Sequence, residues 1–300
     1  MTEPLTTTWA TFIAPDRSIE DSPSPHEALN VPIFSGYRAY DALLGSPETH
    51  NDPLFKMIVE RVTSSGIAAE EQCSAKYYAD VYNVLKVLNG NYNRVAEVGV
   101  FMGGSSVLLA ACALAFDFQL DLVDISPNYL RFTYERIRRT FPEAIDRVRI
   151  FYGGVPEYTR AVLVDDQESV TLVHHDGAHD FNQVVRDLSA LSFVQDRLHS
   201  VILQDTHLRG RPSYMNFVDA AVYAIFGPQM QFAPIGAEYT EDYVDLLKPN
   251  PYQGNYFLAG RPEGMFLPMD ANVFHYPHPS MQIEEFLDPR TLAADAEAAA

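Results

Sequence analysis

Arg94-Val-Ala-Glu-Val-Gly-Val-Phe-Met-Gly-Gly-Ser-Ser106 is the stretch that decides how this chain folds. Its first half is an apolar run of the length expected for a buried strand, and a turn with glycines follows. The next segment, residues 103–115, carries no charged residue on any face. Such a segment predicts a helix that is buried against a sheet. The stretch therefore predicts a strand, a turn and a helix, the unit from which α/β sheets are built.

The same alternation continues along the middle of the chain. Helix start signals occur at Ser126-Pro127 and at Asp180 with Gln183, which predict N-caps. Strands that alternate with helices imply a parallel sheet covered on both faces. We therefore predict an α/β fold with a doubly wound, mostly parallel sheet. Its further strands are expected at residues 120–125, 147–152, 170–175 and 200–204, with a late strand at 255–259 and a helix at 75–88 ahead of the first strand.

Proline-rich ends flank this alternating region and suggest three segments. We predict that residues 1–53 form a partly disordered N-terminal arm or lid, and that residues 54–262 form the α/β domain. Residues 263–300 are then a C-terminal extension with a frayed end. Trp9 and Phe12 give the arm apolar surface to bury, so both a lid and an arm exchanged in a homodimer stay open.

Charge and cysteine content exclude several classes of protein. The chain has 40 acidic and 21 basic residues, and a net charge of −19 repels phosphate backbones and anionic lipid. Cys73 and Cys112 form neither a disulfide pattern nor a zinc motif, which suits a reducing compartment. The longest uncharged apolar segment, residues 101–116, is shorter than the about 20 residues that a spanning helix needs. We expect a cytoplasmic protein without nucleic-acid or membrane partners.

Candidate ligand-binding residues lie at the predicted strand ends, where open α/β sheets bind their ligands. Glu97 and Gly99 stand at the end of the first strand, and the G-x-G-x-x-G pattern of dinucleotide binders is absent there. An acid in this loop disfavours a pyrophosphate and favours a cationic group. Asp124 ends the second strand, 25 residues after Gly99, where a carboxylate can accept both ribose hydroxyls. S-adenosylmethionine, a nucleoside with a positively charged tail, fits these features.

The order of four motifs resembles class I S-adenosylmethionine-dependent methyltransferases. The motifs are residues 96–106, 122–125, 175–179 and 201–206, and the resemblance covers about residues 75–262. The sequence is most similar to the small-molecule O-methyltransferase branch, which includes macrocin and mycinamicin O-methyltransferases and the cephalosporin-hydroxylase-like proteins. The resemblance implies methyl transfer to a hydroxyl of a natural-product or sugar-like small molecule. The cofactor-binding residues that it implies are Glu97, Gly99, Phe101, Gly103, Ser105, Asp124, Ile125, Gly154 and Asp176.

The fourth and fifth strand ends would organise the transfer. Several family members bind Mg²⁺ with an acid at the fourth strand and an acidic pair at the fifth. Asp176 and Asp205 match this pattern, whereas Gln204 replaces one acid by a neutral ligand, so a weak magnesium site on these three residues stays open. The catalytic residues that we expect are His179, Asp176 and His207. Without a metal, one of the two histidines would remove the acceptor proton, and activity would rise through a pKa of about 6–7.

Two alternatives stay open at this point. An N-methyltransferase would use the same cofactor site, and a non-catalytic relative could retain the binding of a nucleoside cofactor. A nucleotide-dependent oxidoreductase is disfavoured by Glu97 and by the missing glycine pattern. His174 and His175 lie inside the fourth predicted strand, and we expect at least one of them to be a core residue.

Overall fold

The computed structural model describes residues 8–209, 217–238, 243–244, 256–257 and 260–275. Their main sheet has eight strands in the order β1-β4-β3-β2-β5-β6-β11-β8. β2 to β6 pair in parallel, whereas β1, β8 and β11 are antiparallel to their neighbours. The strands of this sheet are β1 (Thr11–Ile13), β2 (Arg94–Val98), β3 (Gln119–Asp124), β4 (Val148–Tyr152), β5 (Thr171–His175), β6 (Leu198–Leu203), β8 (Ala233–Glu238) and β11 (Pro262–Pro268).

A small second sheet has the order β7-β10-β9. Its strands are β7 (Leu208–Arg209), β9 (Tyr243–Val244) and β10 (Tyr256–Phe257). The late strand predicted at residues 255–259 therefore exists as β10, although it belongs to this small sheet and not to the main one.

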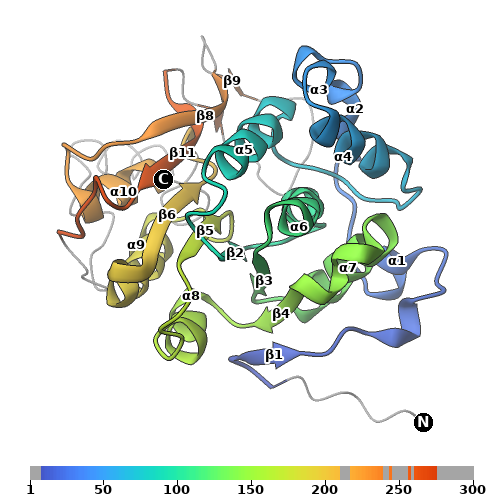
Figure 1. Cartoon of the computed structure of the whole chain (residues 1–300), viewed down its shortest axis with the longest axis horizontal. Coiled ribbons are helices and arrows are strands. Elements are labelled where there is room, and N and C mark those ends of the chain that lie inside the picture. Colours follow the sequence, from blue (N-terminus) through green and yellow to red (C-terminus); the bar gives the residue numbers. More distant parts are fainter. Residues whose placement is uncertain (1–7, 210–216, 239–242, 245–255, 258–259, 276–300) are drawn as a thin grey trace, which may run out of the picture.

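Helices cover both faces of the main sheet (Figure 1). The predicted doubly wound, mostly parallel α/β fold is thus confirmed. The helices are α1 (Pro25–Ala28), α2 (Ala39–Leu43), α3 (Pro47–His50), α4 (Pro53–Ser64), α5 (Ala75–Val87), α6 (Gly104–Phe116), α7 (Pro127–Thr140), α8 (Val155–Tyr158), α9 (Phe181–Leu191) and α10 (Val218–Phe226). Shorter helical turns lie at Arg17–Ile19, Pro142–Arg147, Thr159–Leu163 and Ser192–Arg197.

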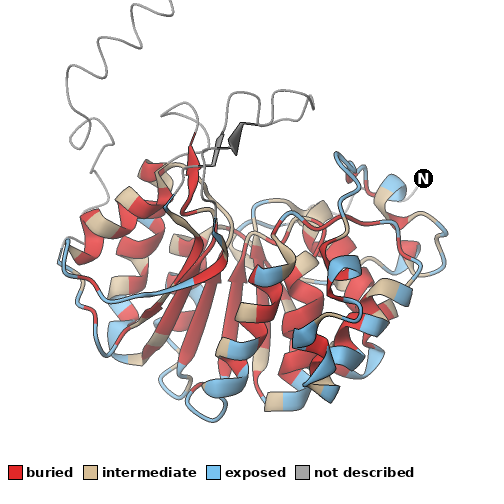
Figure 2. Ribbon diagram, turned by 90° about the horizontal axis from the view of Figure 1, so that it is seen from above, coloured by how far each residue is buried: buried red, intermediate tan, exposed pale blue. Residues whose placement is uncertain are grey.

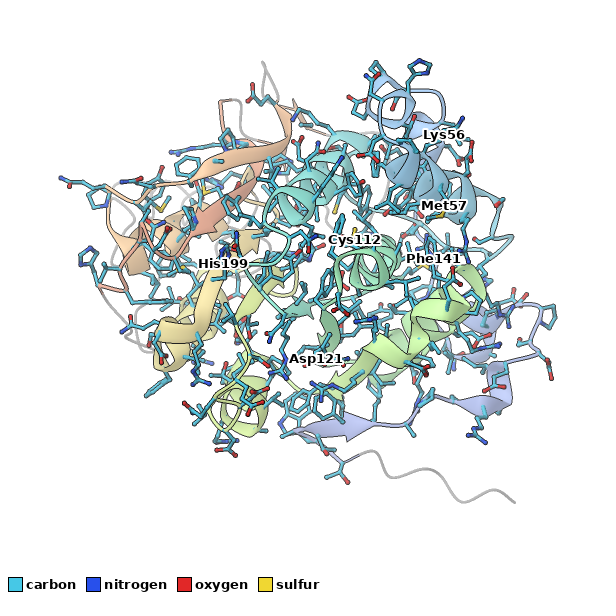
Figure 3. All side chains as sticks on the ribbon, in the orientation of Figure 1. Lys56, Met57, Cys112, Asp121, Phe141 and His199 are labelled. Atoms are coloured by element: carbon cyan, nitrogen blue, oxygen red, sulfur yellow. The ribbon has the colours of Figure 1, made fainter. Side chains whose placement is uncertain are left out.

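Two apolar cores form because successive strand residues point to opposite faces. Val95 and Leu172 belong to the core beneath α5 and α6, whereas Ala96 and Val173 belong to the core beneath α9 and α10. Figure 2 shows the strands as a buried layer between helices whose outer faces are exposed. Both cysteines are free and buried, and Figure 3 shows Cys112 on α6 within the first core. Among the described residues, no helix is long and apolar enough to cross a bilayer.

The helix start signals act as predicted, with one difference. The Ser126 side chain accepts a hydrogen bond from the Tyr129 N–H and so caps α7. The Asp180 side chain accepts from the Gln183 N–H at the start of α9. The Gln183 side chain, however, donates to Asp187 at 2.8 Å, so only half of the predicted capping box forms.

The proline-based segment boundaries do not match the structure. β11 pairs with β6 inside the main sheet, so residues 263–268 are part of the domain and not of an extension. Prolines stand only at the two ends of β11, where they interrupt little of the hydrogen-bond ladder. Within the predicted arm, β1 pairs with β4, and α2 contacts α4 and α5. Residues 8–53 are thus an ordered part of the domain; the predicted frayed end lies outside the described residues.

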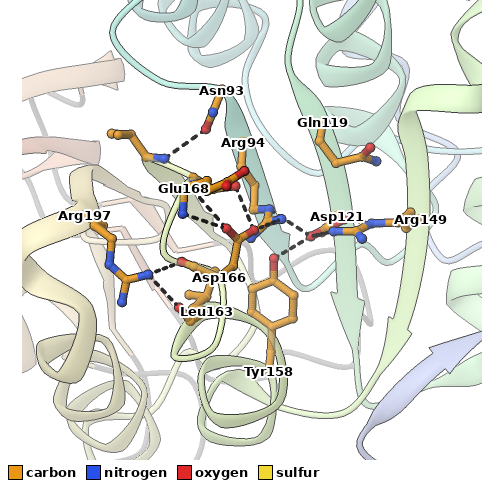
Figure 4. Close-up of polar contacts among 12 residues, drawn as sticks. Asn93, Arg94, Gln119, Asp121, Arg149, Tyr158, Leu163, Asp166, Glu168 and Arg197 are labelled. Atoms are coloured by element: carbon orange, nitrogen blue, oxygen red, sulfur yellow. Dashed lines mark hydrogen bonds and ion pairs between the residues drawn. The ribbon is translucent and has the colours of Figure 1, made fainter.

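A partly buried ionic network ties the central strands to α8 (Figure 4). Asp121 of β3 accepts two hydrogen bonds from the Arg149 guanidinium, both at 2.7 Å, and one from the Tyr158 hydroxyl at 2.6 Å. Arg94 of β2 donates to Asp166 at 2.6 Å. Because Tyr158 belongs to α8, the network also fixes the loop that leads from β4 into this helix.

Candidate active site

A large cavity of about 1080 Å³ lies at the carboxyl ends of β2 to β6. The strand order explains why it forms there, since parallel strands end at the same edge of the sheet. Most residues that the sequence singled out line this cavity. They are Glu97, Gly99, Phe101, Ser105, Asp124, Ile125, Gly154, Asp176, His179, Gln204 and Asp205.

Glu97 places a buried carboxyl group in the cavity wall. The side chain is almost completely buried, and burial raises the pKa of Glu97 well above its usual range. Its Oε2 atom has no hydrogen-bond partner among the described residues, which is costly for a buried carboxyl oxygen. A cationic group in the cavity would both pair with this oxygen and favour the charged carboxylate.

Gly99 is required by the close approach of two strand ends. It has a φ of +78°, and a Cβ at this position would lie 2.3 Å from the Asp176 carbonyl oxygen. Any side chain here would therefore separate the loop after β2 from the loop after β5. Glycine keeps the two loops in contact and so holds Asp176 beside the turn that begins α6.

Asp124 braces the loops after β2 and β3. Its carboxylate accepts hydrogen bonds from the Val100 N–H at 2.8 Å and from the Ser126 N–H at 2.7 Å. Burial raises the pKa of Asp124, although these N–H groups oppose that effect. A carboxylate oxygen accepts more than one hydrogen bond, so the group retains capacity for ribose hydroxyls. The next residue, Ile125, is 71% exposed and also lines the cavity.

Asp176, His179 and Asp205 converge at the other end of the cavity. One ligand atom from each lies within 4.8 Å of the others. The His179 Nε2 atom is 3.2 Å from Asp205 Oδ2 and 3.5 Å from Asp176 Oδ1, yet neither contact has hydrogen-bond geometry. Gln204 lies next to this cluster in the lining, and its buried Oε1 atom also has no hydrogen-bond partner in the part of the chain that the structure describes. Atoms that surround a point without bonding one another are an arrangement that suits a cation.

The two carboxylates also change the acidity of His179. Burial alone would lower the pKa of His179, but Asp205 and Asp176 outweigh burial and raise it to about 9. Burial and the nearby Asp176 raise the pKa of Asp205. Both shifts have one origin: a buried site with two carboxylates binds a proton tightly. The expected pKa of about 6–7 for a metal-free base therefore does not describe His179 in this environment.

Two of the predicted site residues, Gly103 and His207, do not line the cavity. Gly103 is the N-cap of α6, and a Cβ there would lie 2.9 Å from Thr133 of α7, so this glycine permits helix packing. His207 is 3% exposed, and burial lowers its pKa. Its position beside Asp205 in the sequence suggested a role in the cavity, but the turn after β6 directs it into the protein.

His174 and His175 are both core residues, as expected for at least one of them. His174 is fully buried and contacts the Tyr77 hydroxyl at 3.0 Å, and burial lowers its pKa to about 3. His175 Nε2 lies 2.8 Å from an oxygen of Asp187 on α9. The two rings point to opposite faces of β5, because they are neighbours in one strand.

Sequence reasoning missed the wall that the N-terminal segment contributes. Glu70 accepts hydrogen bonds from the N–H groups of Ser35 and Gly36, both at 2.7 Å, and thereby holds the loop that carries Phe34. The Phe34 ring stacks on Phe101 with a centroid distance of 6.0 Å. Trp9, Phe34, Tyr37 and Glu70 all line the cavity. The only sequence signal for this wall was the aromatic content of the predicted arm.

Comparison with known proteins agrees with this geometry. Residues 96–205 match the sequence profile of a family described as a methyltransferase domain. The matched segment runs from the strand that carries Glu97 to Asp205, one of the three residues whose arrangement suits a cation. Residues 96–205 are thus a methyltransferase domain. A search of curated proteins found no significant match to the chain.

Solved structures similar to this chain include three with a bound cofactor or its product. Cofactor-bound Rv0187 from MTB is 16% identical, with 76% of this chain and 95% of that chain covered and a TM-score of 0.45. The O-methyltransferase from Bacillus cereus in complex with SAH is 10% identical, with 72% and 91% covered and a TM-score of 0.43. TomG, the O-methyltransferase of tomaymycin synthesis from Streptomyces achromogenes in complex with SAM, is 12% identical, with 72% and 90% covered and a TM-score of 0.43.

Proposed function

We propose that this methyltransferase transfers the methyl group of S-adenosylmethionine to a hydroxyl of a small molecule, of the natural-product or sugar-like kind. One observation carries the proposal. A single cavity has two acids suited to the cofactor at one part, Glu97 and Asp124, and the cluster of Asp176, His179 and Asp205 at another. Methyl transfer needs both parts, because the cofactor and the acceptor must be aligned in one space.

The residues present fit the cofactor. S-adenosylmethionine supplies a methyl group on a sulfonium, together with its own leaving group. The unpaired Oε2 of Glu97 suits the ammonium of its amino-acid part. The carboxylate of Asp124 suits the ribose hydroxyls. Binding of a cation also removes the cost of leaving Glu97 unpaired in a buried wall.

The cation cluster fits Mg²⁺ as a second cofactor. Asp176 and Asp205 would hold it with Gln204, whose unpaired oxygen offers a neutral third ligand. A bound Mg²⁺ would supply Lewis acidity that makes the acceptor hydroxyl easier to deprotonate. A Mg²⁺ held by Asp176 and Asp205 would offset the two carboxylate charges that raise the pKa of His179, so that its imidazole would be neutral and able to accept a proton. His179 lies 3.2 Å from Asp205 in the lining, and we assign to it the removal of the hydroxyl proton. His207 has no part in this arrangement, since it does not line the cavity.

We further expect a cytoplasmic protein that has neither nucleic acid nor membrane as a partner, and a homodimer stays open. The net charge of −19 supports the exclusion of polyanionic partners. The apolar N-terminal segment, with Phe12 37% exposed at an edge strand, supports self-association.

Two measurements test the proposed function. Calorimetry with S-adenosylmethionine, S-adenosylhomocysteine and NAD, with and without magnesium, should show binding of the first two only. Incubation with S-adenosylmethionine and a panel of hydroxylated natural products and sugars should then yield a methoxy carbon in the NMR spectrum of a product. An N-methyl product would show that the acceptor atom is a nitrogen and not a hydroxyl oxygen. Cofactor binding without any product would favour a non-catalytic relative, and tight NAD binding would overturn the class.

A further inference from the structure

Trp9 is a half-covered aromatic ring at the wall of the cavity. It is the only tryptophan of the chain and lies two residues before β1. Its ring packs edge-on against Tyr152, the last residue of β4, with a centroid distance of 5.0 Å. The side chain nevertheless remains 46% exposed, and it lines the cavity. Apolar surface left open in a concave site is typical of surface that a ligand covers.

The strand order decides which part of the cofactor reaches this ring. Along the sheet, β1 is followed by β4, β3, β2, β5 and β6. Neighbouring strands lie about 4.8 Å apart, so β1 is about 24 Å from β6. Asp205 follows β6, Glu97 belongs to β2 and Asp124 to β3. With the reacting methyl near β5 and β6 and the ribose on Asp124, the base must extend past β3 toward β4 and β1.

β1 is anchored firmly enough to present Trp9 at this place. The Ala10 N–H donates to the Tyr152 carbonyl at 2.8 Å, and Thr11 pairs with Tyr152 in the antiparallel ladder. The central carbon of the Arg149 guanidinium lies over the Phe12 ring, 4.4 Å from the centroid of the ring. Figure 4 shows that the same guanidinium is held by Asp121. The ionic network of the sheet therefore also fixes the N-terminal strand.

Gly153 leaves space for an aromatic ring that packs on β1. A Cβ at position 153 would lie 2.7 Å from the Phe151 ring, whereas its 3.5 Å distance to the Ala10 Cα would be an ordinary contact. The Phe151 ring in turn packs edge-on against Phe12 of β1, with a centroid distance of 5.4 Å. The loop after β4, which also lines the cavity with Gly154, and the N-terminal segment form one continuous wall.

We propose that Trp9 stacks on the purine base of the cofactor, so that the N-terminal strand completes the cofactor site. The inference rests on the proposed function, because the ligand must be an adenine nucleoside. Ile125, 71% exposed in the same cavity, offers a second apolar surface to the base. Trp9 is a positioning residue here: it holds the nucleoside and takes no part in the proton transfer.

The intrinsic fluorescence of the protein tests this directly, since all tryptophan emission comes from Trp9. Titration of the wild-type protein with S-adenosylhomocysteine or with adenosine should change the emission intensity with a saturating dependence. Methionine, which lacks the base, should leave it unchanged. A merely structural Trp9 would give no saturable response to adenosine, and that result would overturn the proposal.

Variants measured by calorimetry provide the second test. Trp9→Ala should weaken S-adenosylhomocysteine and adenosine by roughly 10- to 100-fold, and Trp9→Phe should restore most of the affinity. Phe193→Ala is the matched control, because Phe193 is 79% exposed and does not line the cavity. Thermal unfolding confirms that each variant is folded. If the wild type binds S-adenosylhomocysteine and Trp9→Ala binds it equally well, this inference alone fails. If the wild type does not bind S-adenosylhomocysteine at all, the proposed function fails as well.

Discussion

The Nε2 atom of His179 lies 3.2 Å from Asp205 Oδ2, so a loop after β5 meets a loop after β6 through one imidazole nitrogen. Asp205 reaches this nitrogen from a left-handed backbone conformation, with a φ of +61°. Such a conformation costs of order 1–3 kcal/mol and is concentrated at functional sites. The contact therefore marks the point of the cavity where chemistry is expected.

Replacement of His179 should separate catalysis from cofactor binding. His179→Ala should lower kcat by about 10²- to 10⁴-fold, the usual contribution of a general base, with S-adenosylhomocysteine affinity nearly unchanged. Steady-state rates and calorimetry on the same preparation measure the two effects. His199→Ala is the control, since His199 lies at the opposite end of β6 and outside the cavity lining. Wild-type turnover in His179→Ala would remove His179 from the mechanism.

Removal of divalent cations should abolish activity if the cluster holds a metal. Treatment with a chelator should stop turnover, and added Mg²⁺ should restore it, because Asp176 and Asp205 would otherwise oppose formation of a negative oxygen nearby. Asp205→Asn should require more Mg²⁺ for half-maximal activity, since the site loses a charged ligand. Glu157→Gln, a change at an acid elsewhere in the lining, serves as the control. Full activity in the chelated enzyme would show that no metal is needed.

Replacement of Gly99 by alanine should lower the stability of the domain more than the same replacement at another glycine with a positive φ. Gly99 and Gly66 have φ values of +78° and +68°, but only Gly99 has backbone atoms in the way of a Cβ. Gly66→Ala should cost about 1–2 kcal/mol, the price of the left-handed conformation alone. Gly99→Ala should cost more and should also weaken S-adenosylhomocysteine. Urea unfolding measures both variants, and equal losses of stability would contradict the steric argument.

Acid should remove the contribution of Asp166 to stability. Burial opposes its ionisation, but Ser169, the Glu168 N–H and Arg94 lower the pKa of Asp166 to about 2. Because the folded-state pKa lies below the unfolded value of 3.8, the stabilisation is fully present above about pH 4. It is lost as the pH falls through about 2. After allowance for solvent screening, it amounts to about 1 kcal/mol.

The comparison of Asp166→Asn with the wild type tests this pH dependence. Urea unfolding at pH 7 should show the variant to be less stable, and the difference should shrink at the lowest pH at which both proteins fold. Asp165→Asn changes the exposed neighbouring acid and should be neutral at every pH. A difference that is independent of pH would indicate that the ion pair with Arg94 is not its source.

Local sequence determined the central part of this protein. The period of apolar residues predicts β2 to β6 and the helices between them, because a buried strand and a buried helix each impose a local pattern. The parallel order of these strands brings their ends together, and this is why Glu97, Asp124, Asp176 and Asp205 could be named as neighbours before the structure was known. The role of Gly99 in a turn was also predictable, since this glycine stands between a predicted strand and a predicted helix.

Tertiary structure alone decided the edges of the sheet and the walls of the cavity. β1 and β11 join strands that are more than 50 residues away, and no local period encodes such a partner. For the same reason, no local pattern predicts that Glu70 holds the Phe34 loop. The aromatic content of the arm left both a lid and an exchanged arm open, and only the packing of β1 on β4 places Trp9 at the cavity. His207 is the reverse case: it lies two residues after Asp205, but the turn after β6 buries it. Sequence neighbours share a backbone, whereas the packing of distant segments decides which side chains share a cavity.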